Sequence, residues 1–198
     1  ERSAHREAIK HLATGIGLLR MLPQTPESIQ REINLQTMLA LAYVATEGWA
    51  APEAERAYQR AYALGHQLNA SADLVPVLFG MATMYELRGE YQKSQALLEE
   101  RLGLPRASAE DEAVIESHEL FACSMFHQGA FESSLEHAEH GLTLYNSERQ
   151  YSLLAMYGDD PGVSCHDWAA LSLWFLGFPD QALARAMEAV ALAKDQQY

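Results

Sequence analysis

No segment of the chain alternates for long between apolar and polar residues, as a half-buried strand would. Alanine, leucine, glutamate, glutamine and arginine, all strong helix formers, dominate the sequence instead. This pattern predicts an all-α fold. The expected helices, with ends placed to within a few residues, span 3–21, 27–46, 53–68, 72–88, 91–102, 109–128, 131–145, 148–156, 164–176 and 179–195.

The chain repeats itself internally. Three segments superpose without a gap, namely "EAIKHLATGIGLL" (7–19), "SSLEHAEHGLTLY" (133–145) and "QALARAMEAVALA" (181–193). Small residues coincide at equal offsets in all three, for example Gly15 and Gly141. Because small side chains let two antiparallel helices approach closely, we interpret these segments as the second helices of equivalent hairpins.

A glycine precedes each of four expected second helices. Gly48, Gly89, Gly129 and Gly177 are 41, 40 and 48 residues apart, and a bulky residue follows shortly after each of the last three. Paired helices with such a turn are typical of tetratricopeptide (TPR) repeats, whose standard period is about 34 residues. We therefore expect 1–198 to form a single TPR-like α-solenoid of about four to five hairpins, stacked into a right-handed superhelix with one concave surface.

Charge narrows the classes of partner. The formal net charge is −13 and the acidic residues are spread along the chain, so the surface repels nucleic-acid phosphates and anionic lipids. No apolar run approaches the roughly 20 residues of a membrane helix, and "ERSAHREAIK" lacks the apolar stretch of a signal peptide. We expect a cytoplasmic protein without nucleic-acid or membrane partners. The absent initial methionine and the helical pattern at the C-terminal end indicate a piece of a longer protein.

The stretch "GDDPGVSCHDW" is the most chemical-looking part of the chain. We expect Ser164 to cap the helix through 176, with Asp167 completing a capping box. Asp159 and Asp160 fit either a turn or a bound cation, but the spacing is not that of an EF-hand. The alternative to a protein-binding role is a small-ligand or metal sensor near Asp159–His166. Its weak candidate ligands are Asp159, Asp160, Cys165 and His166.

Other candidate chemistry has simpler explanations. His137 and His140 are three residues apart on one expected helix, but zinc takes three or four protein ligands, so we interpret them as part of a polar face. Cys123 lies in the apolar run "LFACSMF" and fits a helix core. The nucleophile elbow, Walker loop, dinucleotide fingerprint and zinc-protease motif are all absent from the sequence. We expect no catalytic residues, no cofactor and no enzymatic activity.

A partner-binding groove is expected on the first helices, at positions counted back from the turn glycines. The candidates are Phe79, Thr83, Glu86, Glu119, Phe126, His127, Asp167 and Trp174, with Cys123, Leu171 and Phe175 at neighbouring positions. A groove that mixes aromatic and acidic side chains favours an apolar segment with some basic residues. The alternative, equally supported by the sequence, is that these residues pack against an adjoining repeat and bind no partner.

The segments "GWAAPE" and "YGDDPGV", together with the repeats, carry a family resemblance. The whole chain resembles the C-terminal TPR-like region of bacterial multidomain signalling proteins with a class III adenylate or guanylate cyclase domain and an AAA/STAND-type ATPase domain. Related regions occur behind protein kinase domains and in LuxR-like transcriptional regulators. The resemblance implies a non-catalytic module that binds a protein or peptide, including other domains of the same chain, and controls or scaffolds a linked cyclase or ATPase. Neither the cyclase metal-binding aspartates nor a phosphate loop is present.

Overall fold

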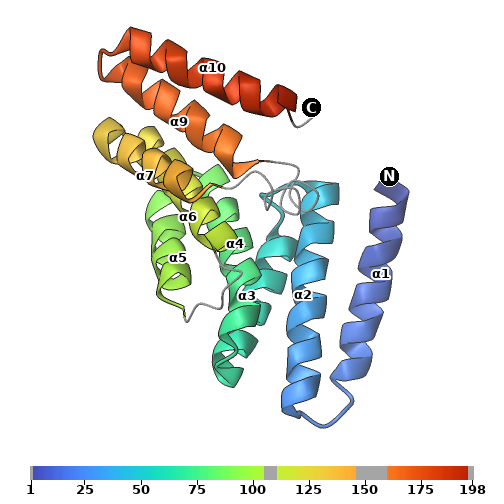
Figure 1. Ribbon diagram of the computed structural model, residues 1–198. Coiled ribbons are helices and arrows are strands. Elements are labelled where there is room, and N and C mark those ends of the chain that lie inside the picture. The colour runs from blue at the N-terminus through green and yellow to red at the C-terminus, as the bar shows by residue number, and fades with distance from the viewer. Residues whose placement is uncertain (1, 105–110, 146–159, 196–198) are drawn as a thin grey trace. The chain divides into compact units, whose positions relative to one another are not determined.

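The computed structural model describes residues 2–104, 111–145 and 160–195 (Figure 1). Every regular element in these residues is an α-helix, as predicted. The helices are α1 (Arg2–Leu19), α2 (Pro26–Glu47), α3 (Pro52–Leu68), α4 (Ser71–Leu87), α5 (Tyr91–Gly103), α6 (Asp111–His127), α7 (Phe131–Leu144), α9 (Pro161–Phe175) and α10 (Pro179–Asp195). The helix expected at 148–156 lies outside the described residues.

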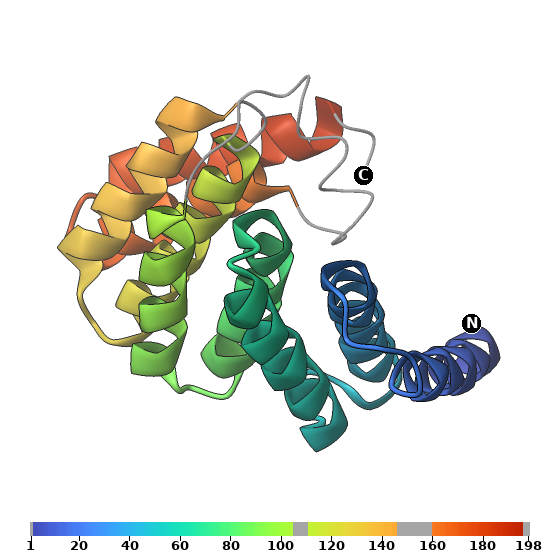
Figure 2. The same cartoon turned by 90° about the horizontal axis from the view of Figure 1, so that it is seen from below.

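The chain divides into two compact units, Glu1–Pro105 and Arg106–Tyr198. In the first unit, α2 pairs with α3 and α4 pairs with α5, while α1 packs against α2 at the edge of the unit (Figures 1 and 2). In the second unit, α6 pairs with α7 and α9 pairs with α10, and α9 also packs against both α6 and α7. Each unit is therefore built from helix hairpins whose first helix packs on the preceding hairpin. That 1–198 forms one continuous solenoid stays a prediction.

Glycine ends the first helix of every hairpin. The φ angles of Gly48, Gly89, Gly129 and Gly177 are 89°, 74°, 78° and 89°. This left-handed backbone region is open to glycine and costly for residues with a Cβ atom. The turns predicted from the sequence are thus confirmed, and their residue type follows from the backbone that each turn needs.

Small residues allow helices to approach closely inside both units. A Cβ atom on Gly80 of α4 would lie 2.4 Å from the ring of Tyr58 on α3. A Cβ atom on Gly141 of α7 would lie 2.7 Å from Sγ of Cys165 on α9. Both distances are far below van der Waals contact, so neither helix pair could pack as it does around a larger residue.

The core of the second unit includes polar side chains that are fully paired. Ser134 on α7 donates a hydrogen bond to the carbonyl oxygen of Ala122 on α6 at 2.7 Å. Ser172 on α9 donates to the Ser134 hydroxyl at 2.9 Å. The three buried residues join α6, α7 and α9 at the place where Ala138 and Ala169 also meet. Buried hydroxyls are tolerated there because they are hydrogen-bonded.

Candidate functional site

In the second unit, α6 and α9 are the first helices of the two hairpins, and both contribute to a cluster of aromatic and imidazole rings. This aromatic cluster consists of Phe126, His127, Phe131, Trp168 and Phe175. The ring of Phe126 lies 5.4 Å from Phe175 and 5.6 Å from Trp168, measured between centroids. Phe175 also stacks on Phe131 at 4.7 Å. The structure thus brings together three sequence candidates, Phe126, His127 and Phe175, at the ends of α6 and α9.

Beside this cluster, the end of α9 exposes large apolar side chains. Trp174 is 64% exposed and Phe175 is 59% exposed, and both Leu171 and Phe178 are also exposed. Exposed apolar groups gathered on one side of a helix commonly mark a binding surface, and tryptophan is prominent among residues that dominate binding energy. Asp167 is exposed on the same helix. The combination offers apolar contact with a nearby negative charge.

The candidates in the first unit lie in a different environment. Phe79 and Glu86 are only 8% and 5% exposed. The Arg101 guanidinium lies 4.9 Å above the Phe79 ring, and the Thr83 hydroxyl donates to the Phe79 carbonyl oxygen at 2.9 Å. Little of Phe79 or Glu86 is accessible to a partner. Their role in a binding groove stays a prediction, and their burial argues against it.

Two members of the aromatic cluster, Phe131 and Trp168, were not among the groove candidates. Phe131 is the bulky residue that follows the Gly129 turn and begins α7. Trp168 is seven residues before Phe175, which places both on one side of α9 because seven residues are nearly two helical turns. That spacing is a signal from which Trp168 could have been found. Glu119, the remaining candidate of α6, is half-buried.

Asp160 is the N-cap of α9, so the predicted cap at Ser164 is wrong. One carboxylate oxygen of Asp160 accepts hydrogen bonds from the backbone N–H groups of Gly162 at 2.8 Å and Val163 at 3.1 Å. The other accepts the hydroxyl of Tyr145 at 3.1 Å. The helix starts at Pro161, so Ser164 and Asp167 lie inside it and form no capping box. Proline favours the first helical position, a local signal that marks the residue before it as the cap.

The other candidate metal ligands have separate surroundings. Cys165 is buried against Gly141 of α7. His166 Nδ1 lies 3.3 Å from a carboxylate oxygen of Glu188 on α10. Burial lowers the pKa of His166, and although the Glu188 charge opposes this, the pKa stays below its ordinary value. Asp159 lies outside the described residues.

Among the described residues, Asp160, Cys165 and His166 belong to no set of three metal-ligating atoms within 4.8 Å of one another. A metal site near Asp159–His166 stays a prediction, which metal analysis of the purified protein would test. The carboxylate of Asp160, for which the sequence allowed either a turn or a bound cation, has three hydrogen-bond partners, and two of them are the backbone N–H groups that it caps.

The structure adds a third histidine to the pair noted in the sequence. His118 of α6 lies against His137 and His140 of α7, with a distance of 2.9 Å between Nδ1 of His118 and Nδ1 of His137. The rings of His118 and His140 stack at 4.2 Å, and His137 stacks on Phe121 at 4.8 Å. Burial lowers the pKa of His137, helped by the charge of His140 and opposed by that of Glu136. The cluster joins two helices of one hairpin.

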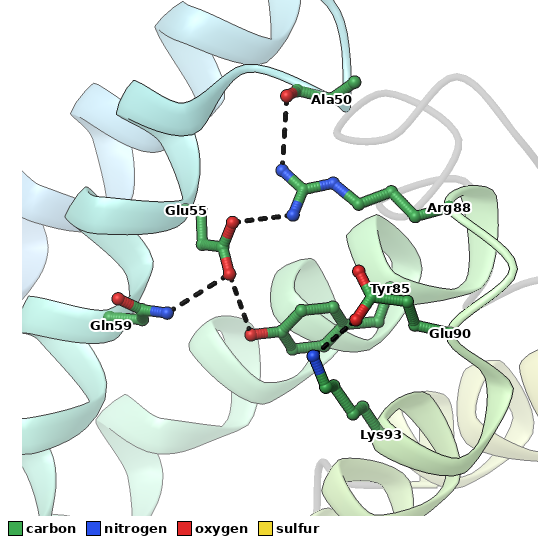
Figure 3. A network of polar contacts seen from close by, with 7 residues as sticks. All are labelled: Ala50, Glu55, Gln59, Tyr85, Arg88, Glu90 and Lys93. Carbon is green, nitrogen blue, oxygen red and sulfur yellow. Dashed lines mark hydrogen bonds and ion pairs between the residues drawn. The ribbon is translucent and has the colours of Figure 1, made fainter.

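Glu55 is the centre of a polar network in the first unit (Figure 3). Its carboxylate accepts hydrogen bonds from Arg88 at 2.6 Å, Tyr85 at 3.1 Å and Gln59 at 3.2 Å. The hydrogen bond from Arg88 lowers the pKa of Glu55, and this outweighs the opposing effect of burial. Arg88 also donates to the Ala50 carbonyl oxygen at 3.3 Å. The network joins the start of α3 to the end of α4, which is a structural role.

Glu32 of α2 is a buried carboxylate that also has cationic partners. Arg60 of α3 donates to it at 3.0 Å and Arg20 approaches it at 3.4 Å. Burial alone would raise the pKa of Glu32, but the hydrogen bond and charge of Arg60 and the charge of Arg20 lower it. The two arginines line a groove of about 360 Å³ between α1, α2 and α3. Because Glu32 pairs with both, the arginines are held by the fold.

Comparisons with known proteins identify the fold. No family model and no curated protein matches the chain. The solved structure "MamA AMB-1" is similar to it with a TM-score of 0.58 and 18% sequence identity, covering 96% of this chain and 98% of its own. "MamA MSR-1" is similar with a TM-score of 0.52 and 17% identity, covering 98% of each chain. Both are TPR-like helical repeat proteins, and this chain has the TPR-like helical repeat fold predicted from its sequence.

Proposed function

We propose that this chain is a non-catalytic protein–protein interaction module. A surface on its second unit binds an apolar peptide segment that carries basic residues. The observation that carries the proposal is the exposure of Trp174 and Phe175 at the end of α9, beside the aromatic cluster. TPR-like repeats are surfaces for other polypeptides rather than scaffolds for catalysis, and their stacked hairpins present extended binding faces.

The chemistry of the surface defines the partner. Trp174, Phe175, Leu171 and Phe178 provide apolar contact, so the partner needs aliphatic or aromatic side chains. Asp167 and Asp180 are exposed on α9 and α10, and the whole chain carries a formal charge of −13. Opposite charge accelerates association and selects partners, so lysine or arginine beside the apolar residues is favoured.

The resemblance noted in the sequence adds a more specific proposal. In a bacterial signalling protein, the partner would be another domain of the same polypeptide, a cyclase or an ATPase, and binding would control its activity. The full domain order of the parent gene tests this part directly, because a regulatory role requires a catalytic neighbour.

Peptide binding tests the main proposal. An array of short peptides that combine apolar residues with lysine or arginine is probed with the wild-type protein and with Trp174→Ala. Met187→Ala, which removes a similarly exposed side chain from α10, is the matched control. We expect Trp174→Ala to lower the affinity for the bound peptides by about tenfold or more, as removal of a central interface residue does. Met187→Ala should have little effect on that affinity.

Crosslinking to the cyclase or ATPase domain that the more specific proposal requires complements the array. Binding of neither peptides nor domains would contradict the proposal. Equal binding by the wild type and Trp174→Ala would also contradict it, because the surface at the end of α9 would then have no part in recognition.

A further inference from the structure

A glutamate carboxylate joins the second helices of neighbouring hairpins in two places. In the first unit, Tyr62 of α3 donates a hydrogen bond to one carboxylate oxygen of Glu100 on α5 at 2.7 Å. His66 Nε2 lies 2.9 Å from the other oxygen. In the second unit, Arg185 of α10 pairs with Glu139 of α7 at 2.7 Å. A carboxylate is therefore the group that bridges second helices in this protein.

The groove of about 360 Å³ between α1, α2 and α3 lies at the equivalent place between the second helices α1 and α3. The gap-free superposition of α1 on α7 puts Ala13 at the position of Glu139. Buried alanines seven residues apart align α3 with α10, namely Ala54 and Ala61 with Ala182 and Ala189. This alignment puts Ala57 at the position of Arg185. Ala13 and Ala57 both line the groove, so small side chains lie where the second unit has an ion pair.

Three arginines line the same groove. Arg56 and Arg60 are one helical turn apart on α3, and Arg20 follows the end of α1. Arg20 and Arg60 approach the same oxygen of Glu32, at 3.4 Å and 3.0 Å. Among the described residues, the three arginines pair only with Glu32 and Glu53. One positive charge is therefore in excess at this groove, although the chain carries a formal net charge of −13.

The guanidinium groups are accessible, and the fold holds two of them in place. The side chains of Arg20, Arg56 and Arg60 are 56%, 67% and 38% exposed. Buried Glu32 fixes Arg20 and Arg60 from below, so these two lose little conformational freedom when a ligand binds. The buried side chains of Ile16 and Leu39 add apolar surface to the lining.

The chemistry of the groove defines what it can bind. A guanidinium group presents a planar set of N–H donors that matches the two oxygen atoms of a carboxylate. The groove supplies such donors but has Ala13 where the second unit has the glutamate, so the carboxylate must come from a ligand. Its volume exceeds that of one acidic side chain, and part of its lining is apolar. A peptide segment meets both requirements, because neighbouring residues fill the remaining space.

We propose that the groove between α1, α2 and α3 binds an acidic peptide segment. A glutamate or aspartate side chain of the segment pairs with Arg56 and Arg60, and an aliphatic neighbour contacts Ile16 and Leu39. This inference goes beyond the proposed function, because it concerns the first unit and a peptide of the opposite charge.

Matched peptides test the need for a carboxylate. Fluorescently labelled hexapeptides that combine glutamate with leucine and alanine are the probe, and the same peptides with glutamine in place of glutamate are the control. Fluorescence anisotropy measures their binding to the 198-residue protein. We expect saturable binding of glutamate peptides, with an affinity about tenfold or more above that of the glutamine peptides, because only a carboxylate forms charged hydrogen bonds with arginine.

Two variants locate the bound carboxylate. Ala13→Glu puts a glutamate at the position of Glu139, so it should occupy the arginines and lower the affinity for the peptides about tenfold or more. Thr14→Glu, which adds the same charge at an exposed residue outside the groove, is its matched control. Arg56→Gln should also lower the affinity, whereas Arg6→Gln, outside the groove, should change it little. Circular dichroism checks that all variants keep their helix content.

Several results would overturn the inference. They are the absence of binding by any glutamate peptide, equal binding of glutamate and glutamine peptides, and an equal loss of affinity in Ala13→Glu and Thr14→Glu. Free glutarate is the remaining test. If it binds as tightly as the peptides and is displaced by Ala13→Glu in the same way, the ligand is a small dicarboxylate and the peptide site is refuted.

The results separate this inference from the proposed function. Trp174→Ala should leave the binding of glutamate peptides unchanged, and loss of their binding in that variant would place them on the other surface and refute the groove. If glutamate peptides require Arg56 while Trp174→Ala changes nothing in the array of basic peptides, the groove stands and the surface at the end of α9 is refuted.

Discussion

Single carboxylates hold together parts of this protein that are distant in sequence. Asp160 caps α9 and accepts the hydroxyl of Tyr145. Glu32 joins Arg20 and Arg60, and Glu55 joins Tyr85 and Arg88. Asp160 and Glu32 are buried and Glu55 is half-buried. Burying a carboxylate costs free energy that hydrogen bonds and ion pairs offset, so each of these acids fixes the positions of its partners as well as its own.

The two candidate caps of α9 can be compared directly. Asp160→Ala removes two hydrogen bonds to backbone N–H groups and one to Tyr145, so we expect it to lower the free energy of unfolding by about 1–2 kcal/mol. Ser164→Ala should change it by less than about 0.5 kcal/mol, because Ser164 lies inside the helix. Urea unfolding followed by circular dichroism measures both. A larger loss for Ser164→Ala would contradict the assignment of the cap.

Glu32 predicts how stability depends on pH. Its pKa in the folded protein is below the ordinary value of 4.5, so it contributes stability above pH 4.5 that is lost as the pH falls through the folded pKa. Glu32→Gln should therefore be less stable than the wild type at pH 7, by about 1 kcal/mol, and the difference should shrink below pH 4.5. Urea unfolding at several pH values measures this. Glu7→Gln, on the exposed face of α1, is the control, and a difference independent of pH would contradict the prediction.

Helices and their turns were predicted best because their signals are local. The nine described helices begin and end within about three residues of the predicted limits, as expected for boundaries read from sequence. Gly48, Gly89, Gly129 and Gly177 were found from their spacing, and all have positive φ. The start of α9 was the exception, because Asp160 and Ser164 are both good caps in the same loop.

Two glycine substitutions separate turns from helix interiors. Gly177→Ala places a Cβ atom at φ 89°, so we expect a loss of about 1–2 kcal/mol in the free energy of unfolding. Gly17→Ala lies inside α1 with nothing within 4 Å of the added carbon, so a gain of about 0.5–1 kcal/mol is expected. Thermal unfolding of both variants measures the effects, and the same sign for both would refute this explanation.

The whole molecule combines an acidic chain with two apolar surfaces of different charge. None of the described helices is both long and apolar enough to cross a bilayer. The surface at the end of α9 has the acidic neighbours Asp167 and Asp180. The first unit has an apolar groove between α1 and α2, whose lining includes one cation, Arg31. The two units therefore differ in the charge that lies beside their exposed apolar side chains.

The candidate surface shows where prediction from sequence ends. Counting from the turn glycines found Phe126, His127 and Trp174, which the structure places in or beside the aromatic cluster. The same counting selected Phe79 and Glu86, which are buried. Position on a helix face depends on helical periodicity, which the sequence contains. The exposure of a residue depends on which other helix covers that face, and no local sequence pattern contains this information.

The sequence by itself determined the all-helical class, the hairpin repeat, the turn glycines and the acidic character of the chain, because all of these depend on residues that are close along the chain or on composition alone. Only the tertiary structure decided that Asp160 caps α9, that His118 joins His137 and His140, and that α6 covers Gly141. These features depend on contacts between distant segments, and packing among helices chooses between side chains that are equally suitable in sequence.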